Sequence, residues 1–426
     1  MTARPWVIQG AGRLVSSLAL SAAAWAAAMT PFSAHAQSSV DASIVTLPQA
    51  FAAAWLRQPE ARSAEARRQA ADAQGAVARS WTAEPIALEL SAKSDRLSGN
   101  NGAREYAVGI AAPLWLPGER SGTQALAQAE RSAVDSRIDA ARWRLAGTVR
   151  EAWWAAQRAA LETALAEARL ANASQLAADV ARRVKAGDLS RADQHQADGA
   201  VAAAQSALAE SQGAQAQARQ ALRAITGIAP SQALPTRAEP PPSEAARAGT
   251  DHPALRELDS RAELARRARG LASVQSRANP ELTLSAARDR GAFGDAYGQT
   301  LTLGLRIPFG SADRQRARQA SAGAEQAEAE SQLELERSRI AADIATAQFR
   351  ADAAQRVVAA ADQRAALADQ TKRLFEKSFR LGESDLPTRL RVELEAFEAE
   401  RQRERARIDQ AQAVSQWRQA LGLLPE

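Results

Sequence analysis

Four short segments of the chain alternate apolar and polar residues, whereas the sequence around them has the spacing of helices. In residues 300–310 every second position is apolar, namely Leu301, Leu303, Leu305 and Ile307. This period of two predicts a strand with one apolar face. By the same criterion we expect four strands in two pairs, at about 85–93, 106–114, 281–288 and 299–308.

Long helices are predicted before and after each pair of strands. They are expected at 47–81, 118–186, 189–226, 252–277, 313–381 and 385–421. Gly187 and Gly382 break the helical pattern after the two longest of them. In these two, apolar residues recur at alternating spacings of four and three, from Val134 to Ala159 and from Ile340 to Ala368. This heptad pattern predicts seams between helices rather than a compact core.

The second half of the chain repeats the first at an offset of 195 positions. Gly109 recurs as Gly304, and Gly187 recurs as Gly382. We therefore expect a signal peptide, a first repeat, a proline-rich extended connector and a second repeat, at 1–36, 37–228, 229–250 and 251–426.

Residues 1–36 have the pattern of a secretory signal peptide. Arg4 and Arg13 are their only charges, residues 14–29 are uncharged, and the small residues Ala34 and Ala36 precede the expected cleavage site. An uncleaved membrane anchor is the alternative. Without these two arginines the formal charge falls from +5 to +3, so the isoelectric point of about 10.1 does not indicate a strongly basic mature chain.

Composition narrows the classes of function. Aromatic residues make up 4% of the 426 residues, and the absence of cysteine excludes disulfides and thiolate metal sites. Basic and acidic residues are interspersed, so we expect no nucleic acid partner. His195 lies in a polar helical segment, and His252 precedes a proline at a helix start. No catalytic, cofactor-binding or metal-binding motif is recognisable, so we expect neither an enzyme nor a cofactor.

The predicted strands have two chemically different faces. The apolar face suits acyl chains, and the candidate lipid-facing residues are Ile110, Leu303 and Leu305. The opposite face suits a water-filled lumen, with Glu89, Thr302 and Arg306 as candidates. A soluble sheet packed on a core is the alternative, but the neighbouring helices are rich in alanine and charge. Because four strands cannot close a barrel, several chains would have to pool their strands.

The duplicated helix–strand–strand–helix–helix order resembles the TolC-like outer membrane factors, as do the segments "VKAGDLSRAD" and "FRLGESDLPTR" after the long helices. The resemblance covers the whole mature chain. It implies a mainly α fold with a small membrane β-barrel contribution. In that fold, four strands per protomer join a trimeric barrel, and long antiparallel coiled-coil helices form a periplasmic tunnel. It also implies an outer-membrane exit duct of a Gram-negative tripartite efflux or secretion system, working as a homotrimer with a periplasmic adaptor and an inner-membrane pump.

Two further segments, "NPELTLSAARD" and "PLWLPGERSGTQALAQAE", resemble the heavy-metal-efflux (CzcC-like) branch. The letters "PGER" depart from the Gly-Gly-Lys/Arg pattern usual in that branch. This narrower resemblance implies metal ions or small toxic compounds as the cargo.

The resemblance also implies a gate at the periplasmic tip, where Gly187 and Gly382 break the helices. Family members close this tip with polar and charged networks, and their acidic residue six positions after the glycine corresponds to Asp193 and, in the second repeat, to Thr388. The candidate gate residues are Asp188, Asp193, Glu383, Asp385, Thr388 and Arg391. Ordinary helix capping is the alternative for each of them.

Two other classes of protein compete with the duct. A periplasmic adaptor also contains helical hairpins, but normally one hairpin set into strand-rich domains, whereas this chain has two hairpins and few strands. A coiled-coil scaffold outside the membrane would need neither the alternating strands nor the duplication.

Overall fold

The computed structural model describes residues 46–228, 238–248, 251–310 and 312–426. Residues 44–426 form one compact unit, so the predicted signal peptide lies outside the described residues, as does part of the predicted connector. The described elements are α1 (Leu47–Arg57), α2 (Pro59–Ala78), β1 (Ala87–Ser94), β2 (Arg104–Pro113), α3 (Glu119–Ala186), α4 (Arg191–Thr226), α5 (Glu244–Ala248), α6 (Pro253–Val274), β3 (Glu281–Arg290), β4 (Gly298–Arg306), α7 (Ala312–Arg380) and α8 (Leu386–Ala420).

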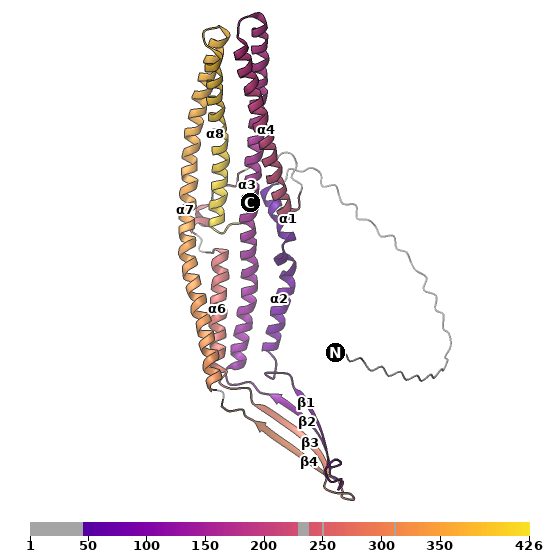
Figure 1. Ribbon diagram of the computed structural model, residues 1–426. Helices are drawn as coiled ribbons and strands as arrows, with labels where there is room; N and C mark the ends of the chain where they lie inside the picture. Colours follow the sequence, from indigo (N-terminus) through magenta and orange to yellow (C-terminus); the bar gives the residue numbers. More distant parts are fainter. Residues whose placement is uncertain (1–45, 229–237, 249–250, 311) are drawn as a thin grey trace, which may run out of the picture. The chain divides into compact units, whose positions relative to one another are not determined.

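Two long helices, α3 and α7, organise the helical part of this unit. They have 68 and 69 residues, which corresponds to about 100 Å each at 1.5 Å per residue. Each folds back at its C-terminal end, so that α4 packs on α3 and α8 packs on α7 (Figure 1). Helix α2 covers the other half of α3, and α6 packs against both α3 and α7.

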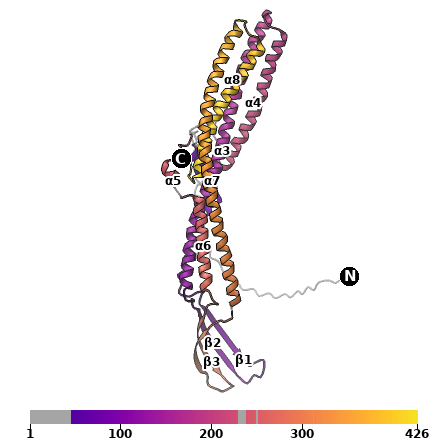
Figure 2. The same cartoon turned by 90° about the vertical axis from the view of Figure 1, so that its left-hand side faces the viewer.

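All four strands form one antiparallel sheet in the order β1-β2-β3-β4. Its central pair, β2 and β3, joins the two halves of the chain. One register row pairs Leu88 with Ile110, Ile110 with Leu284 and Leu284 with Leu303. The sheet and the two hairpin turns lie at opposite ends of the long helices (Figures 1 and 2).

The helix expected at 47–81 is two helices, because Pro59 interrupts it. Gln58 is extended, with ψ 140°, and it both ends α1 and precedes α2. Proline has no N–H to donate and disfavours helical geometry in the residue before it. Helix α2 then ends at Ala78. The four predicted strands are present, with ends shifted by up to two residues.

The heptad seam of α7 is confirmed at most positions, since Ile340, Ala347, Ala351, Ala361 and Ala365 are buried. The seam predicted for α3 is partly wrong. Thr148 and Ala155 are exposed within the chain, whereas Val149, Trp153 and Trp154 are buried. An indole buries far more apolar surface than a methyl group, so the two tryptophans determine which side of α3 faces inward.

A compact core lies around these tryptophans, contrary to the expectation of seams alone. Its buried members come from α1, α3, α4 and α8: Leu47, Ala50, Phe51, Ala54, Leu145, Ala146, Val149, Trp153, Trp154, Ala156, Leu222 and Ile408. The core fixes the first repeat to the last helix of the chain.

Candidate functional site

The sheet exposes a continuous apolar face. Three successive register rows on this face consist of Ala112, Leu282 and Leu305; Leu88, Ile110, Leu284 and Leu303; and Leu90, Val108, Ala286 and Leu301. Residues paired across an antiparallel sheet share a face, so these side chains point the same way. Leu301 and Leu303 are 73% and 72% exposed. No helix in the described part of the chain covers this surface.

The opposite face is polar. Glu89 and Thr302 lie in one row with Gly109 and Ser285, and Arg306 forms an ion pair of 3.5 Å with Glu281. The three predicted lumen residues therefore lie on the face opposite Ile110, Leu303 and Leu305. Which face meets lipid stays a prediction.

The two hairpin turns form the tip, at the end remote from the sheet. Gly187 and Gly382 have φ of 88° and 77°, the left-handed geometry that ends a helix at low cost only for glycine. Asp188 and Glu383, which directly follow these glycines, are exposed. Backbone N–H groups of both residues close the turns by donating to Arg183 O at 2.9 Å and Ser378 O at 3.0 Å.

Two of the candidate gate residues, Asp193 and Asp385, cap helices with their side chains. Ser190 Oγ accepts from the Asp193 N–H at 3.2 Å, while Asp193 Oδ2 accepts from the Ser190 N–H at 3.0 Å. In the second repeat Asp385 accepts from the Thr388 N–H at 3.1 Å, and hydrogen bonds from Thr388 lower the pKa of Asp385. The capping alternative thus has direct support at Asp193 and Asp385, and Arg391 pairs with Glu395 at 3.2 Å on the exposed side of α8.

The tip also contains an aromatic contact that the sequence analysis missed. Phe379 is 2% exposed, and the guanidinium carbons of Arg183 and Arg389 each lie 4.8 Å from its ring centroid. Arg183 Nη1 donates to Phe379 O at 3.3 Å. Phe379 belongs to an apolar cluster with Leu176, Val180 and Leu386, so it ties the two hairpins together. Its position one turn before the glycine break was the available signal.

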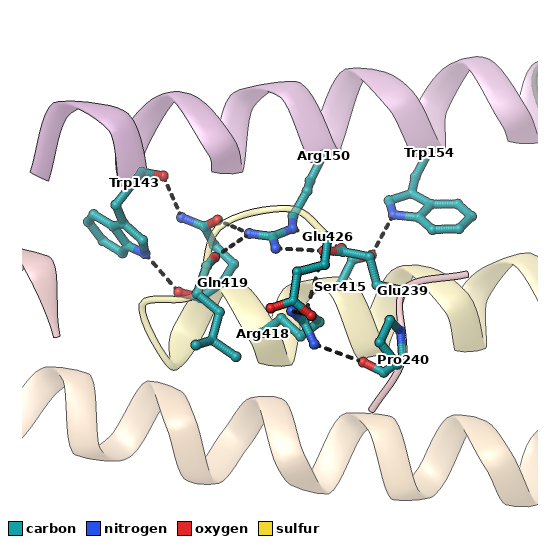
Figure 3. Close-up of polar contacts among 10 residues, drawn as sticks. Trp143, Arg150, Trp154, Glu239, Pro240, Ser415, Arg418, Gln419 and Glu426 are labelled. Carbon is teal, nitrogen blue, oxygen red and sulfur yellow. Dashed lines mark hydrogen bonds and ion pairs between the residues drawn. The ribbon is translucent and has the colours of Figure 1, made fainter. Parts of the chain in front are cut away.

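A second missed feature is a buried ionic clasp, formed by Arg150 of α3, Glu239 of the connector and Arg418 of α8 (Figure 3). All three side chains are at most 3% exposed. Arg150 donates to both carboxylate oxygens of Glu239, at 2.9 and 2.8 Å. Arg418 Nε lies 3.4 Å from the same carboxylate, without hydrogen-bond geometry.

Further contacts hold the ends of the clasp. Arg150 Nη1 donates to Gln419 Oε1 at 2.5 Å and to Leu423 O at 2.9 Å, and Arg418 Nη1 donates to Pro240 O at 3.1 Å. Trp154 Nε1 donates to Ser415 Oγ at 3.0 Å (Figure 3). The described part of the connector is therefore docked on both repeats. It differs from the expected extended connector in that it contains the short helix α5.

The described residues contain no group of three or more His, Asp or Glu side chains able to hold a metal ion. None of the described helices is both long and apolar enough to span a membrane. His195 is exposed, as expected. His252 caps α6, where its Nδ1 accepts from the Ala254 N–H at 3.2 Å.

Comparisons with known proteins match this architecture. Residues 52–228 match the family model described as outer membrane efflux protein. None of the curated proteins has a sequence that matches this chain significantly. The outer membrane protein VceC from Vibrio cholerae is 20% identical with a TM-score of 0.71, over 89% of this chain and 97% of that one.

Two outer membrane channels give similar values. MtrE of Neisseria gonorrhoeae is 19% identical with a TM-score of 0.71, over 88% of this chain and 89% of its own. CmeC of Campylobacter jejuni is 12% identical with a TM-score of 0.70, over 88% and 85%. At these identities the likeness concerns the fold, and it confirms the fold class expected from the sequence. The narrower likeness to the heavy-metal-efflux branch stays a prediction.

Proposed function

Because residues 52–228 match the family model described as outer membrane efflux protein and the chain has a TolC-like fold, we propose that it is one protomer of a trimeric exit duct in the outer membrane. The observation that carries the proposal is the exposed apolar face of the sheet. The leucine, isoleucine and valine side chains of the three rows are 40% to 73% exposed. Exposure of so much apolar surface to water is costly, whereas acyl chains would stabilise it.

Closure across copies follows from the edges of the sheet. β1 and β4 each have one edge without a partner strand among the described residues. A membrane strand with an open edge leaves backbone N–H and C=O groups unsatisfied, and bacterial barrels have about eight strands or more. Pairing β4 of one copy with β1 of the next satisfies both edges, and three copies extend the ring well past that minimum.

The two ends of the long helices have different proposed roles. The sheet lies in the outer membrane, the helices extend into the periplasm, and the tip meets a periplasmic adaptor and, through it, an inner-membrane pump. The duct itself is passive, and it conducts metal ions or small toxic compounds. The mouth of the tunnel carries the carboxylates of Asp188, Asp193, Glu383 and Asp385. Threefold symmetry would arrange each of them in a ring, which serves as an acidic gate.

A periplasmic adaptor is the second candidate, and it is disfavoured by the same apolar face. An adaptor would have to keep the leucines of β4 in water. Cell fractionation distinguishes the two functions. A duct sediments with outer membranes and is extracted only by detergent, whereas an adaptor should not sediment with the outer membrane fraction.

The decisive experiment is purification of the full chain from outer membranes, followed by mass determination and planar-bilayer recording. We expect a detergent-stable trimer that conducts ions. Single cysteines introduced at Leu303 and Thr302 of this cysteine-free chain should react with a water-soluble maleimide only at position 302. A monodisperse monomer that stays soluble without detergent would contradict the proposal.

A further inference from the structure

The apolar face changes character at the loop end of the sheet. Beyond the row that contains Leu301, the next row on the same face consists of Ala92, Tyr106, Arg288 and Gln299, and the row after that pairs Arg104 with Arg290. The side chains that end the apolar belt are therefore a tyrosine and three arginines. They lie at the end of the sheet remote from the helices (Figure 1).

Two of these arginines are held over aromatic rings. The guanidinium carbons of Arg288 and Arg290 lie 4.7 and 5.2 Å from the centroid of Tyr297, and that of Arg290 lies 5.7 Å from Phe293. Such stacking orients a guanidinium while leaving most of its N–H donors free. Among the described residues no carboxylate lies within ion-pair distance of either group, whereas neighbouring Arg104 pairs with Asp95 at 2.9 Å.

The β1–β2 loop is fixed to the end of β3 and to the loop that follows it. The Phe293 N–H donates to Asn101 O at 2.9 Å, and Arg290 Nε donates to Gly102 O at 3.0 Å. Gly102 has φ 96°, and a Cβ there would lie 2.4 Å from the Phe293 nitrogen, so the contact admits only glycine. The two arginines are thus positioned before any ligand arrives.

We propose that Arg288 and Arg290 bind phosphate groups of a phosphorylated glycolipid in the outward-facing leaflet of the membrane. The inference rests on the duct proposed above, because it takes the apolar face as the lipid-facing one. Two guanidiniums without a carboxylate partner among the described residues, next to an acyl-chain surface, complement a ligand that has phosphates at the headgroup and several acyl chains below it. Arginine donates two parallel hydrogen bonds to phosphate, which a single ammonium does not.

Free phosphate could accept the same hydrogen bonds as a lipid headgroup, but it has no acyl chains to contact the apolar rows of the sheet. The three leucine-rich rows begin directly below Arg288, so a lipid gains acyl-chain contact that an inorganic ion cannot. We therefore expect the site to bind a lipid rather than free phosphate. Competition with inorganic phosphate distinguishes these two ligands.

The test is titration of the detergent-purified full chain with lipid A that carries both phosphates, read by native mass spectrometry. R288Q removes one guanidinium whose side chain makes no hydrogen bond to a described residue, and R288Q/R290Q removes both. K93Q is the matched control, because Lys93 lies near the same depth on the opposite face, paired with Glu105 at 3.1 Å. We expect an affinity loss of about tenfold for the double variant, a smaller loss for R288Q, and none for K93Q.

Phosphatase-treated lipid A should bind as weakly to the wild type as intact lipid A binds to the double variant. Equal affinity of R288Q/R290Q and wild type, equal loss in K93Q, undiminished binding of the dephosphorylated lipid, or displacement by submillimolar inorganic phosphate would each overturn the proposal. Oligomeric state and conductance are measured on the same samples. A conducting trimer that retains no lipid A refutes the lipid site alone, whereas a chain that neither trimerises nor conducts refutes the duct and the lipid site with it.

Discussion

At the scale of single residues, the two tip turns use the same two functional groups in exchanged positions. The first repeat has a hydroxyl at the N-cap and a carboxylate three residues later, Ser190 and Asp193, whereas the second has Asp385 and then Thr388. Both arrangements satisfy N–H groups at the start of a helix. A carboxylate six residues after the glycine is therefore not required for the turn, and charge at the tip can be changed separately from capping.

This separation gives a prediction for Asp385. D385S should keep the cap and remove the charge, whereas D385A should remove both, so only D385A should speed amide exchange in the first turn of α8 several-fold. Because the folded-state pKa of Asp385 is lowered, its contribution to stability is present above about pH 4 and is lost as the pH falls through the lowered value. Hydrogen exchange of the tip measures the cap, and single-channel recording measures the charge. Equal exchange in both variants would contradict the capping role.

His252 gives a prediction in a different pH window. Its Nδ1 accepts a backbone hydrogen bond, its ring meets Trp143 edge-on at 4.7 Å, and burial lowers its pKa from the ordinary 6.5. The folded state therefore binds fewer protons than the unfolded state between the lowered pKa and 6.5, so stability should fall as the pH drops below about 6.5. H252N retains a capping acceptor but does not titrate. The Tm of the wild type should decline more steeply than that of H252N between about pH 7 and pH 5, and parallel curves would exclude His252 as the cause.

At the scale of elements, periodicity predicted strands better than helix faces. Leu301, Leu303 and Leu305 alternate without interruption, and a period of two leaves only two faces to choose between. On α3 the alanine-rich sequence permits several faces at nearly equal apolarity, and the heptad through Thr148 and Ala155 was one of them. The side that is buried within the chain is decided by Trp153 and Trp154, whose partners come from α1, α4 and α8 and are invisible to a local pattern.

The two faces of β4 predict opposite effects of a new charge. In the proposed duct, L303R places a guanidinium among acyl chains and should reduce the stability of the protein in the membrane by about 2–4 kcal/mol, whereas T302R on the polar face should cost much less. The yield of heat-stable oligomer after refolding into phosphatidylcholine vesicles measures the difference. Equal yields for the two variants would show that the apolar face does not contact lipid.

At the scale of the whole chain, the ionic clasp joins parts that sequence reasoning kept separate. Arg150 and Glu239 are 89 positions apart, and Arg418 lies in the last helix. One glutamate in a proline-rich segment carries no local sign that it will be buried between two arginines. Repeats, strand pairs and turns were accessible from the sequence because each depends on near neighbours, whereas this contact depends on the completed fold.

Neutralising the clasp should destabilise the whole unit. E239Q leaves Arg150 buried without a balancing charge, whereas Arg418 retains its ion pair with Glu426 at 2.8 Å, and we expect a loss of about 3–5 kcal/mol in the free energy of unfolding. E244Q is the control, because Glu244 lies on the same segment but is exposed. Denaturant unfolding of the detergent-solubilised chain measures both variants. If E239Q and E244Q unfold at the same denaturant concentration, the clasp contributes nothing to stability.

The pairing of β2 with β3 sets the order of events during biogenesis. It brings Arg104 against Arg290, so the centre of the sheet cannot form until the chain has been exported at least as far as the end of β3. Until then the β1–β2 hairpin stands alone, and an isolated two-stranded hairpin is marginally stable in water. Contacts between residues as far apart in sequence as β2 and β3 also form slowly during folding. The leucine-bearing face is therefore exposed to solvent for the longest part of maturation, and this interval is when the chain most needs a holding chaperone and is most vulnerable to aggregation.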